Sequence, residues 1–335
     1  MRYRVPATPD GAQERREPPT FSVVIPCFQG ASTIGDAVAS VLGQTYAPAG
    51  VIVCDDGSTD DLEGALAPHA HAVTLLRQEH RGVSAARNLG LRHAMGEFVA
   101  TCDADDLYLP DLLETFAALA VTRPDLDILC CDAQLELDEQ PLGRGRPDPG
   151  TFVVDDQRIG ILRENFVPGR SAFRRRRLLD AGGYDEALEC AEDWDVWMRL
   201  ILGGSRAGYV DAALARTRMH AGSLSASPRR LWSAQMVVLE KALGRDDLVE
   251  AERTVARSHL GELQRAMRLA DLRDAVAEGR PGLRRDAIWL AVAPGFSAPT
   301  RLKATLAAVS PRTARRFLQP ESGDHRAAAR LPASP

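Results

Sequence analysis

The chain has 335 residues, of which 45% are hydrophobic and 26% charged, and its formal net charge at pH 7 is −5. This composition excludes a fibrous or wholly disordered chain, and the length predicts one large domain with a substantial core plus an additional part. The net negative charge argues against a protein that binds nucleic acid.

The charges are unevenly distributed along the chain. Residues 1–227 carry 34 acidic and 22 basic side chains, whereas residues 228–318 carry 10 acidic and 17 basic ones. Scattered basic side chains on helices are either an ordinary solvated surface or a surface that faces an anionic membrane. The sequence therefore leaves open a peripheral association of the C-terminal region with the inner face of a membrane.

The ends of the chain and the cysteines bear on where the protein is located. Residues 1–20 lack the apolar centre of a signal peptide, and we expect them, like residues 319–335, to be a disordered tail. No stretch approaches 18 uninterrupted apolar residues, since the best candidate ends at Pro294. The six cysteines form no C-x-x-C pair, which is typical of a protein in the reducing cytoplasm.

Apolar runs and helical periodicity alternate from residue 21 onward. We expect strands at residues 22–26, 51–54, 72–76 and 98–102, with helices at residues 31–42 and 83–95 between them. Because continuous apolar strands separated by helices are typical of a sheet that is covered on both faces, the pattern predicts an α/β fold with a mixed, mainly parallel, Rossmann-like sheet flanked by helices.

The second half of the chain continues this pattern and then changes to helices alone. We expect helices at 111–120 and 191–202, strands at 126–131, within 165–173 and at 213–219, and a turn-rich loop at 141–150. From residue 228 the sequence is rich in Ala, Leu, Arg and Glu, which predicts helices. The expected organisation is an α/β domain over residues 21–227, a helical region over 228–318 and the two tails.

Three carboxylates follow the predicted strand at 98–102. Asp103 and Asp105 are two residues apart, so on an extended backbone they point the same way and could bind a divalent cation such as Mg²⁺ or Mn²⁺. The alternative is a solvated turn or a helix cap, and for an isolated motif of this kind the cap would be favoured.

The residues that follow two other predicted strands also bear on a binding site. Cys27 and Phe28 follow the strand at 22–26, and Asp55 and Asp56 follow the strand at 51–54. Because ligands bind beyond the carboxyl ends of parallel strands, these segments and the aspartates after residue 102 are expected to converge on one edge of the sheet. That convergence favours a binding site over isolated turns.

Five motifs in register resemble the family 2 glycosyltransferases. They lie at residues 22–28, 53–60, 82–90, 103–106 and 192–195, in the order and with the separations usual in that family. The resemblance covers about residues 21–225 and implies a GT-A fold, which binds a nucleotide sugar and usually a divalent metal and transfers the sugar with inversion.

The resemblance implies a set of donor-binding residues. Pro26, Cys27 and Phe28 hold the base and ribose, and Asp55 or Asp56 recognises the base, with an Asx turn as the alternative for the latter pair. Gln29 stands where a typical member has Asn.

Within the later motifs the resemblance places further donor and metal contacts. Asp103 and Ala104 lie at the donor, Asp105 is the strongest metal ligand with Asp103 beside it, and His220 could reach the metal or a phosphate. Arg87 pairs either with a phosphate or, as a structural ion pair, with Asp103.

The remaining residues implied by the resemblance belong to the acceptor half of the reaction. Asp193, with Glu192 beside it, matches the catalytic base that takes the proton of the acceptor hydroxyl, and its alternative is a cap at a helix start. Gly183 and Tyr184 line the acceptor side, and Trp194 could stack on an acceptor sugar.

The resemblance therefore predicts a metal-assisted, inverting glycosyltransferase with a UDP- or dTDP-sugar donor and a glycan or lipid-linked saccharide acceptor. Two alternatives remain. A sugar nucleotidyltransferase would have a Gly-rich phosphate loop after the first strand, where this chain has Pro26 to Gly30. A catalytically inactive binding or scaffold protein need not keep both Asp105 and Asp193.

Overall fold

The computed structural model describes residues 3–4, 17–137, 140–145, 149–219, 227–278, 283–292 and 298–309. The chain divides into two compact units, Met1–Ser223 and Leu224–Pro335, called unit 1 and unit 2 below. The division falls a few residues before the boundary expected at residues 227 and 228.

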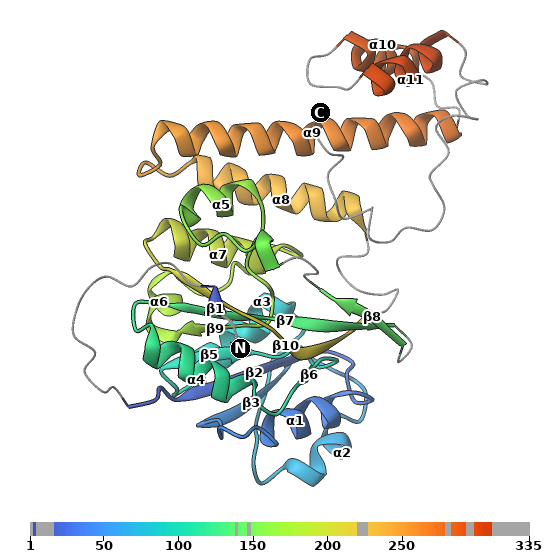
Figure 1. The fold of residues 1–335 in the computed structure, drawn as a ribbon. Coiled ribbons are helices and arrows are strands. Elements are labelled where there is room, and N and C mark those ends of the chain that lie inside the picture. The colour runs from blue at the N-terminus through green and yellow to red at the C-terminus, as the bar shows by residue number, and fades with distance from the viewer. Residues whose placement is uncertain are drawn as a thin grey trace. The chain divides into compact units, whose positions relative to one another are not determined.

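Unit 1 is built on one mixed sheet (Figure 1). Its main strands are β2 (Phe21–Cys27), β3 (Gly50–Asp55), β4 (Thr74–Arg77), β5 (Phe98–Thr101), β7 (Ile128–Leu137), β9 (Ser171–Arg174) and β10 (Ala207–Met219). Strands β4, β3, β2 and β5 run parallel to one another, β9 is antiparallel to β5 and β7, and β10 is parallel to β7. The mixed, mainly parallel sheet expected from the sequence is therefore confirmed.

Three short strands extend this sheet where we expected none. They are β1 (Tyr3–Arg4) and β6 (Leu107–Tyr108), which pair with β10, and β8 (Gln140–Arg144), which pairs with β7. The expectation that all of residues 1–20 form a disordered tail was wrong at Tyr3–Arg4, because two residues suffice to pair with an edge strand.

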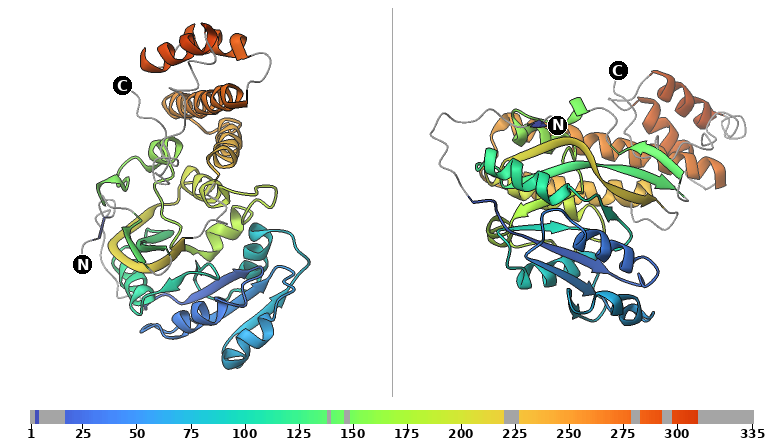
Figure 2. Two further views of the ribbon diagram at one scale, coloured as in Figure 1. Left: turned by 90° about the vertical axis from the view of Figure 1, so that its right-hand side faces the viewer. Right: turned by 60° about the horizontal axis from the view of Figure 1, so that its bottom comes forward.

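Helices cover both faces of the sheet (Figures 1 and 2). They are α1 (Ile34–Leu42), α2 (Leu62–Leu66), α3 (Val83–His93), α4 (Leu112–Thr122), α5 (Gln157–Arg163), α6 (Arg175–Asp180) and α7 (Glu192–Leu202). Short 3-10 turns lie at Ala67–His69 and Pro149–Thr151. Periodicity predicted α1, α3, α4 and α7, but α2 and α5 are too short for periodicity to be recognised.

The alternation of side chains along β2 decides which helix lies on which face. Val23 and Ile25 join the apolar cluster formed with α1 and α4, while Val24 points the other way. There it lies so close to α3 that a Cβ on Gly90 would stand 2.3 Å from Val24 Cγ1. Every residue of β2 is buried, and fully burying one such aliphatic side chain contributes about 1.5–3 kcal/mol. Strand β2 is therefore the centre of the core, and its carboxyl end is held rigidly.

Unit 2 is helical, as expected. Helices α8 (Pro228–Leu243) and α9 (Glu250–Glu278) pack together, and α10 (Leu283–Val292) and α11 (Ala298–Val309) form a second pair. Pro299 lies in the first turn of α11, where its missing N–H costs nothing. Among the described residues, no helix has both the length and the apolar character needed to cross a membrane.

Candidate active site

The carboxyl end of β2 presents an exposed aromatic ring. Pro26 and Cys27 are buried, while Phe28 is exposed and stacks on His80 with 4.1 Å between the ring centroids. Gln29 follows with a left-handed φ of 53°, and its backbone N–H donates to Ser58 Oγ at 3.0 Å. Gln29, the residue that departs from the family pattern, thus ties the end of β2 to the segment after β3.

Asp55 closes the turn after β3. Its Oδ1 accepts a hydrogen bond from the Ser58 N–H at 2.8 Å, and its Oδ2 lies 3.1 Å from Arg77 Nε. The turn that was the alternative for Asp55 is therefore present in the structure, and a contact of Asp55 with a base stays a prediction.

Asp56 is buried and organises the segment that leads into α3. Its Oδ1 accepts hydrogen bonds from Gln78 Nε2 at 2.7 Å and the Arg81 N–H at 2.9 Å, while its Oδ2 accepts one from the Gly82 N–H at 2.8 Å and lies 2.9 Å from His80 Nδ1. Of these neighbours, the Gln78 side chain is half-buried and the His80 side chain is exposed. The role of Asp56 in base recognition stays a prediction, and the structure adds His80 as its neighbour.

The loop after β5 carries the predicted metal ligands. Asp103, Ala104 and Asp105 are half-buried, whereas Asp106 is buried and paired with Arg170. Burial raises the pKa of Asp106 to about 7, against the effect of Arg170 and with a smaller contribution from Asp103. Asp106 and Arg170 therefore hold the loop from inside while Asp103 and Asp105 reach its surface.

Arg87, from α3, lies between the two acidic segments. Its Nη2 is 2.9 Å from Asp103 Oδ1, and its Nη1 is 2.6 Å from Glu192 Oε1. The side chain is only 11% exposed, and its guanidinium carbon lies 5.4 Å from the centre of the Tyr184 ring. Although burial opposes the charged form, Asp103 and Glu192 together hold the pKa of Arg87 well above its usual range. The ion pair with Asp103, one of the two expected roles of Arg87, is present.

Asp193 lies in the first turn of α7, directly after Glu192. The residue before the helix, Ala191, has a left-handed φ of 58°. Asp193 Oδ1 accepts a hydrogen bond from the Trp194 N–H at 2.6 Å. Burial raises the pKa of Asp193 to about 6, and Glu192 adds to this while Arg87 opposes it. A carboxylate with this pKa can accept a proton near neutral pH.

The acceptor-side residues prove to be structural supports. Asn88 accepts a hydrogen bond from the Tyr184 N–H at 2.8 Å and donates one to the Tyr184 carbonyl at 2.9 Å. Gly183, at a φ of 73°, leaves no room for a side chain, since a Cβ would stand 2.5 Å from Asn88 Oδ1. The Tyr184 ring is buried against Arg87, so the expectation that it lines the acceptor side was wrong.

Trp194 was expected to stack on an acceptor sugar, and the structure contradicts this. The side chain is 1% exposed, and its Nε1 donates a hydrogen bond to the Ile161 carbonyl at 3.0 Å. The physical reason is α5, which periodicity did not predict and which covers the indole. Trp194 is a core residue.

The metal ligands can be tested on the donor atoms that the chain offers. Within the described residues, no group of three or more His, Cys, Asp or Glu side chains is placed to hold an ion. Asp103 and Asp105 supply two hard carboxylate groups, and Mg²⁺ is usually bound through one or two carboxylates plus substrate phosphates and water. These residues therefore fit a cation that a diphosphate also binds, whereas His220 lies outside the described residues.

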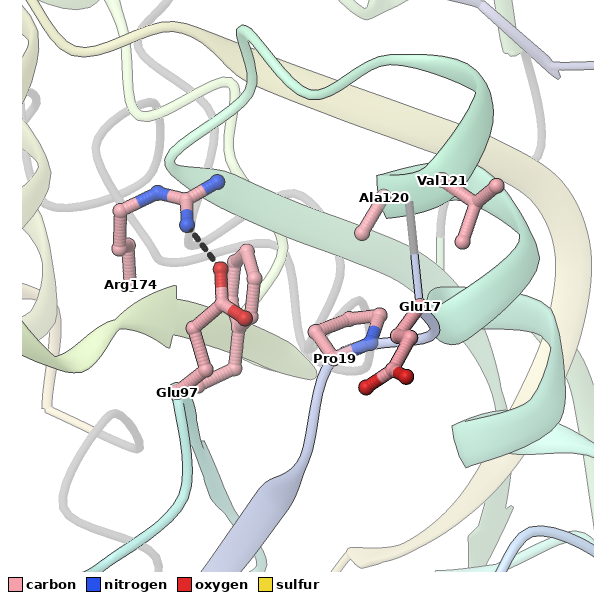
Figure 3. Close-up of a pocket in the computed structure, with 7 residues that line it drawn as sticks. Glu17, Pro19, Glu97, Ala120, Val121 and Arg174 are labelled. Atoms are coloured by element: carbon pink, nitrogen blue, oxygen red, sulfur yellow. Dashed lines mark hydrogen bonds and ion pairs between the residues drawn. The ribbon is translucent and has the colours of Figure 1, made fainter. Parts of the chain in front are cut away.

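A cavity of about 410 Å³ lies beside the amino ends of β2 and β5, whereas the candidate active site lies at the carboxyl ends of the strands (Figure 3). It is bounded by Pro19 before β2, by Glu97 before β5 and by the side chain of Arg174, which pairs with Glu97. These residues lie at the amino ends of β2 and β5, whereas Asp103 follows the carboxyl end of β5. The cavity is therefore not part of the candidate active site.

Sequence reasoning missed the partners that hold the site together. The pairing of Arg87 with Glu192 joins residues 105 positions apart, and Arg170 reaches Asp106 across 64 positions. Neither pair has a local sequence signal, because each forms only when the sheet brings distant segments together.

The sheet and the acidic segments at its carboxyl edge define unit 1 as a glycosyltransferase domain of the GT-A type. Residues 22–181 match the model of the family described as glycosyl transferase family 2. This match lies within unit 1 and identifies a family 2 domain there.

Several described proteins are similar to this chain. An uncharacterized glycosyltransferase of Rickettsia prowazekii is 26% identical over 61% of this chain, and the match spans 65% of that protein's length. The succinoglycan biosynthesis protein ExoU of Rhizobium meliloti is 27% identical over 78% of this chain and 82% of its own. A UDP-Glc:alpha-D-GlcNAc-diphosphoundecaprenol beta-1,3-glucosyltransferase of Escherichia coli is 36% identical over 28% of this chain and 38% of its own.

Solved structures share the fold. TarS of S. aureus, in complex with UDP-GlcNAc, aligns with a TM-score of 0.59 and 20% identity over 89% of this chain and 90% of that one. A mannosyltransferase of Pyrobaculum calidifontis, in complex with GDP-Man and Mn²⁺, aligns with a TM-score of 0.61 and 22% identity over 96% and 88%.

Proposed function

We propose that this chain transfers a sugar from a nucleotide-diphosphate sugar to a hydroxyl group of a glycan or lipid-linked saccharide, with inversion at the anomeric carbon. The observation that carries the proposal is the position of Arg87 between Asp103 and Glu192. One buried guanidinium contacts both acidic segments, so the loop after β5 and the start of α7 face the same small volume. A sugar held there would have a carboxylate on each side of its anomeric carbon.

The loop after β5 serves the leaving group. Asp105 and Asp103 would hold a divalent cation, Mn²⁺ or Mg²⁺, together with the diphosphate of the donor. A cation bound there supplies positive charge that offsets the negative charge of the departing nucleoside diphosphate. Arg87 fixes the orientation of Asp103, and Arg170 fixes the loop through Asp106.

Asp193 serves the acceptor. Its carboxylate takes the proton of the acceptor hydroxyl while the hydroxyl oxygen forms a bond to the anomeric carbon, and the bond from that carbon to the diphosphate oxygen breaks. Attack from the face opposite the leaving group inverts the configuration. The pKa of about 6 keeps Asp193 ionised at neutral pH and basic enough to accept the proton.

The donor and acceptor are inferred from chemistry and from the relatives. Phe28, exposed beside His80, offers a ring face for a base, and Pro26, Cys27, Asp55, Asp56 and Ala104 surround the same edge. The relative from Escherichia coli is named for a UDP-Glc donor and a diphosphoundecaprenol-linked acceptor. These points favour a UDP- or dTDP-sugar and a lipid-linked or polymeric glycan.

The cysteines support a cytoplasmic location. All six cysteine side chains are buried, and none of them forms a disulfide. Free thiols persist in a reducing compartment, whereas secreted proteins commonly oxidise them.

Donor cleavage with defined variants tests the proposal. The wild type is incubated with UDP-, dTDP- and GDP-sugars and either Mn²⁺ or Mg²⁺, and release of the nucleoside diphosphate is measured with and without acceptor glycans. Asp193→Asn and Asp105→Ala should both abolish turnover, while Asp180→Asn, an exposed carboxylate on α6, should not. Equal rates in all four proteins would contradict the catalytic assignment and favour a scaffold protein.

A further inference from the structure

The positive charge of unit 2 is concentrated in its last part. Residues 228–278, which form α8 and α9, carry 9 basic and 9 acidic side chains. Residues 279–318, which include α10 and α11, carry 8 basic side chains and 1 acidic one. The whole excess of positive charge in the helical region therefore belongs to α10, α11 and their flanking segments.

Among the side chains that the structure describes on α10 and α11, small apolar ones are buried and several large apolar ones are exposed. The small residues Ala287 and Ala304 are fully buried, whereas Val292 is 72% exposed and Val309 73% exposed. Ile288 and Trp289 on α10 are exposed as well. A pair of helices that faces water on all sides buries its large side chains and exposes its small ones. This pair has an apolar outer surface.

The exposed residues of α10 share one side of the helix with a basic residue. Arg285, Ile288, Trp289 and Val292 follow the spacing i, i+3, i+4 and i+7, which places them along one face. On α11, Leu302 and Val309 are seven residues apart and share a face in the same way. The Trp289 ring already contacts α9, since the guanidinium carbon of Arg268 lies 4.0 Å from the ring centre, so Ile288 and Val292 are the apolar side chains left beside Arg285. Exposed apolar side chains beside arginine are typical of helices that lie in the interface of a membrane.

Helices α8 and α9 show that this arrangement is not general in unit 2. Val238 and Leu239 on α8 are buried, as are Leu263 and Leu272 on α9. Two of their basic residues are paired with acidic ones: Arg229 of α8 contacts Asp271 and Asp274 of α9, and Arg257 contacts Glu250 within α9. Residues 228–278 are therefore neutral, and most of the large apolar side chains named for α8 and α9 are buried, with Val237 as an exposed exception.

We infer that the outer surface of α10 and α11 docks on an anionic lipid bilayer, lying in its interface without crossing it. The excess positive charge favours anionic lipid over an apolar protein partner or a second copy of this chain, because two copies would bring like charges together. The inference does not depend on the transferase reaction. It would hold the enzyme at a surface where lipid-linked acceptors reside.

Vesicle sedimentation of the full-length protein tests the inference. At low ionic strength the wild type should sediment with phosphatidylcholine vesicles that contain phosphatidylglycerol and should stay in solution with phosphatidylcholine alone. The double variant Ile288→Ser/Val292→Ser should bind about a hundredfold more weakly, since two exposed aliphatic side chains no longer enter the interface. Arg285→Gln should bind about fivefold more weakly.

Matched variants at Val237 on α8, at Val249 just before α9 and at Arg257 on α9 are the controls. Val237→Ser/Val249→Ser removes two exposed apolar side chains, and Arg257→Gln changes the net charge by the same amount as Arg285→Gln. Both should bind vesicles as the wild type does, and circular dichroism should be unchanged in every variant, because each altered side chain is at the surface.

Three results would overturn the inference. They are a wild type that does not sediment with anionic vesicles, controls that lose binding as much as the α10 variants do, and a dimer that Ile288→Ser/Val292→Ser dissociates without any effect of lipid. Donor cleavage distinguishes this inference from the proposed function: the Ile288→Ser/Val292→Ser protein should cleave the donor at the wild-type rate. A protein that binds vesicles but leaves every donor intact would contradict only the proposed function.

Discussion

Each unit of this protein contains an arginine that bridges two carboxylates, and the two bridges differ in burial. In unit 1, Arg87 joins Asp103 to Glu192 and is 11% exposed. In unit 2, Arg229 joins Asp271 to Asp274 and is 36% exposed. The chemistry is the same, but water solvates the second bridge and is excluded from most of the first.

Burial changes what each bridge can do. A solvated ion pair contributes little to stability, about 0–1 kcal/mol, because water competes for both charges. In a buried pair, removal of one partner leaves a charge without compensation. Arg87 therefore holds together two segments that are distant in the sequence, whereas Arg229 adds only a solvated ion pair between α8 and α9.

The largest effect is expected for the base at the edge that Arg87 organises. Asp193→Asn keeps the shape of the side chain but cannot accept a proton, so turnover should fall by about 10²–10⁴-fold. The measurement is the rate of sugar transfer at saturating donor. Thermal unfolding should show a protein at least as stable as the wild type, because the substitution removes a carboxylate whose charged form burial disfavours. A rate within threefold or so of the wild type would remove Asp193 from the mechanism.

The two arginines themselves give the next prediction. Arg87→Met should lower the free energy of unfolding by about 3 kcal/mol, because Glu192, whose side chain is 12% exposed, loses its partner, whereas Asp103, at 44% exposed, is solvated and contributes little. Arg229→Met should lower it by about 0–1 kcal/mol. Denaturant unfolding of both variants measures the difference. Equal losses would show that burial does not distinguish the bridges.

A variant that keeps the positive charge at residue 87 separates the effect of charge from that of the guanidinium shape. Arg87→Lys keeps the positive charge but offers one compact ammonium group in place of the guanidinium fork. It should restore part of the lost stability while leaving turnover low, because one ammonium cannot hold both carboxylates in their positions. Full recovery of turnover would mean that only the charge matters.

A pair of glycines tests the backbone beside Tyr184. Gly183→Ala forces a Cβ against Asn88 and a side chain onto a φ of 73°, whereas Gly182→Ala at a φ of 86° meets open space. Both substitutions should destabilise through the left-handed backbone by about 1–3 kcal/mol, and Gly183→Ala should cost more. Chemical denaturation compares them, and a larger loss for Gly182→Ala would contradict the contact with Asn88.

The smallest effect concerns pH. Because Asp193 acts as a base and has a pKa of about 6, the rate of transfer should fall about tenfold for each pH unit below 6 and level off above it. The folded state binds this proton more tightly than the unfolded state, where the pKa is near 3.8, so this group makes the protein less stable as pH rises from about 4 to 6. Asp193→Asn should remove that dependence. A rate that stays constant down to pH 4 would contradict it.

The sequence could predict the site as far as local pattern reaches. Buried strands followed by acidic residues predicted the sheet, its carboxyl edge and the positions of Asp55 and Asp103 on it, while the resemblance to family 2 glycosyltransferases implied the role of Asp193. Helix α5 is too short for its hydrophobic periodicity to be recognised in the sequence. Trp194 was therefore expected to contact an acceptor sugar, although α5 covers it. Tyr184 was misplaced for a similar reason, since its burial depends on Arg87 and Asn88, which are about 100 residues away.

By itself the sequence determined the α/β domain, the family, the acidic residues at the sheet edge and the basic character of the C-terminal helices, because each of these is written in local composition and spacing. Only the tertiary structure decided which charges are paired and which side chains face water. It placed Arg87 between Asp103 and Glu192, buried Trp194, and left Ile288 and Val292 exposed. Burial and pairing depend on segments distant in the chain, so no local pattern could have contained them.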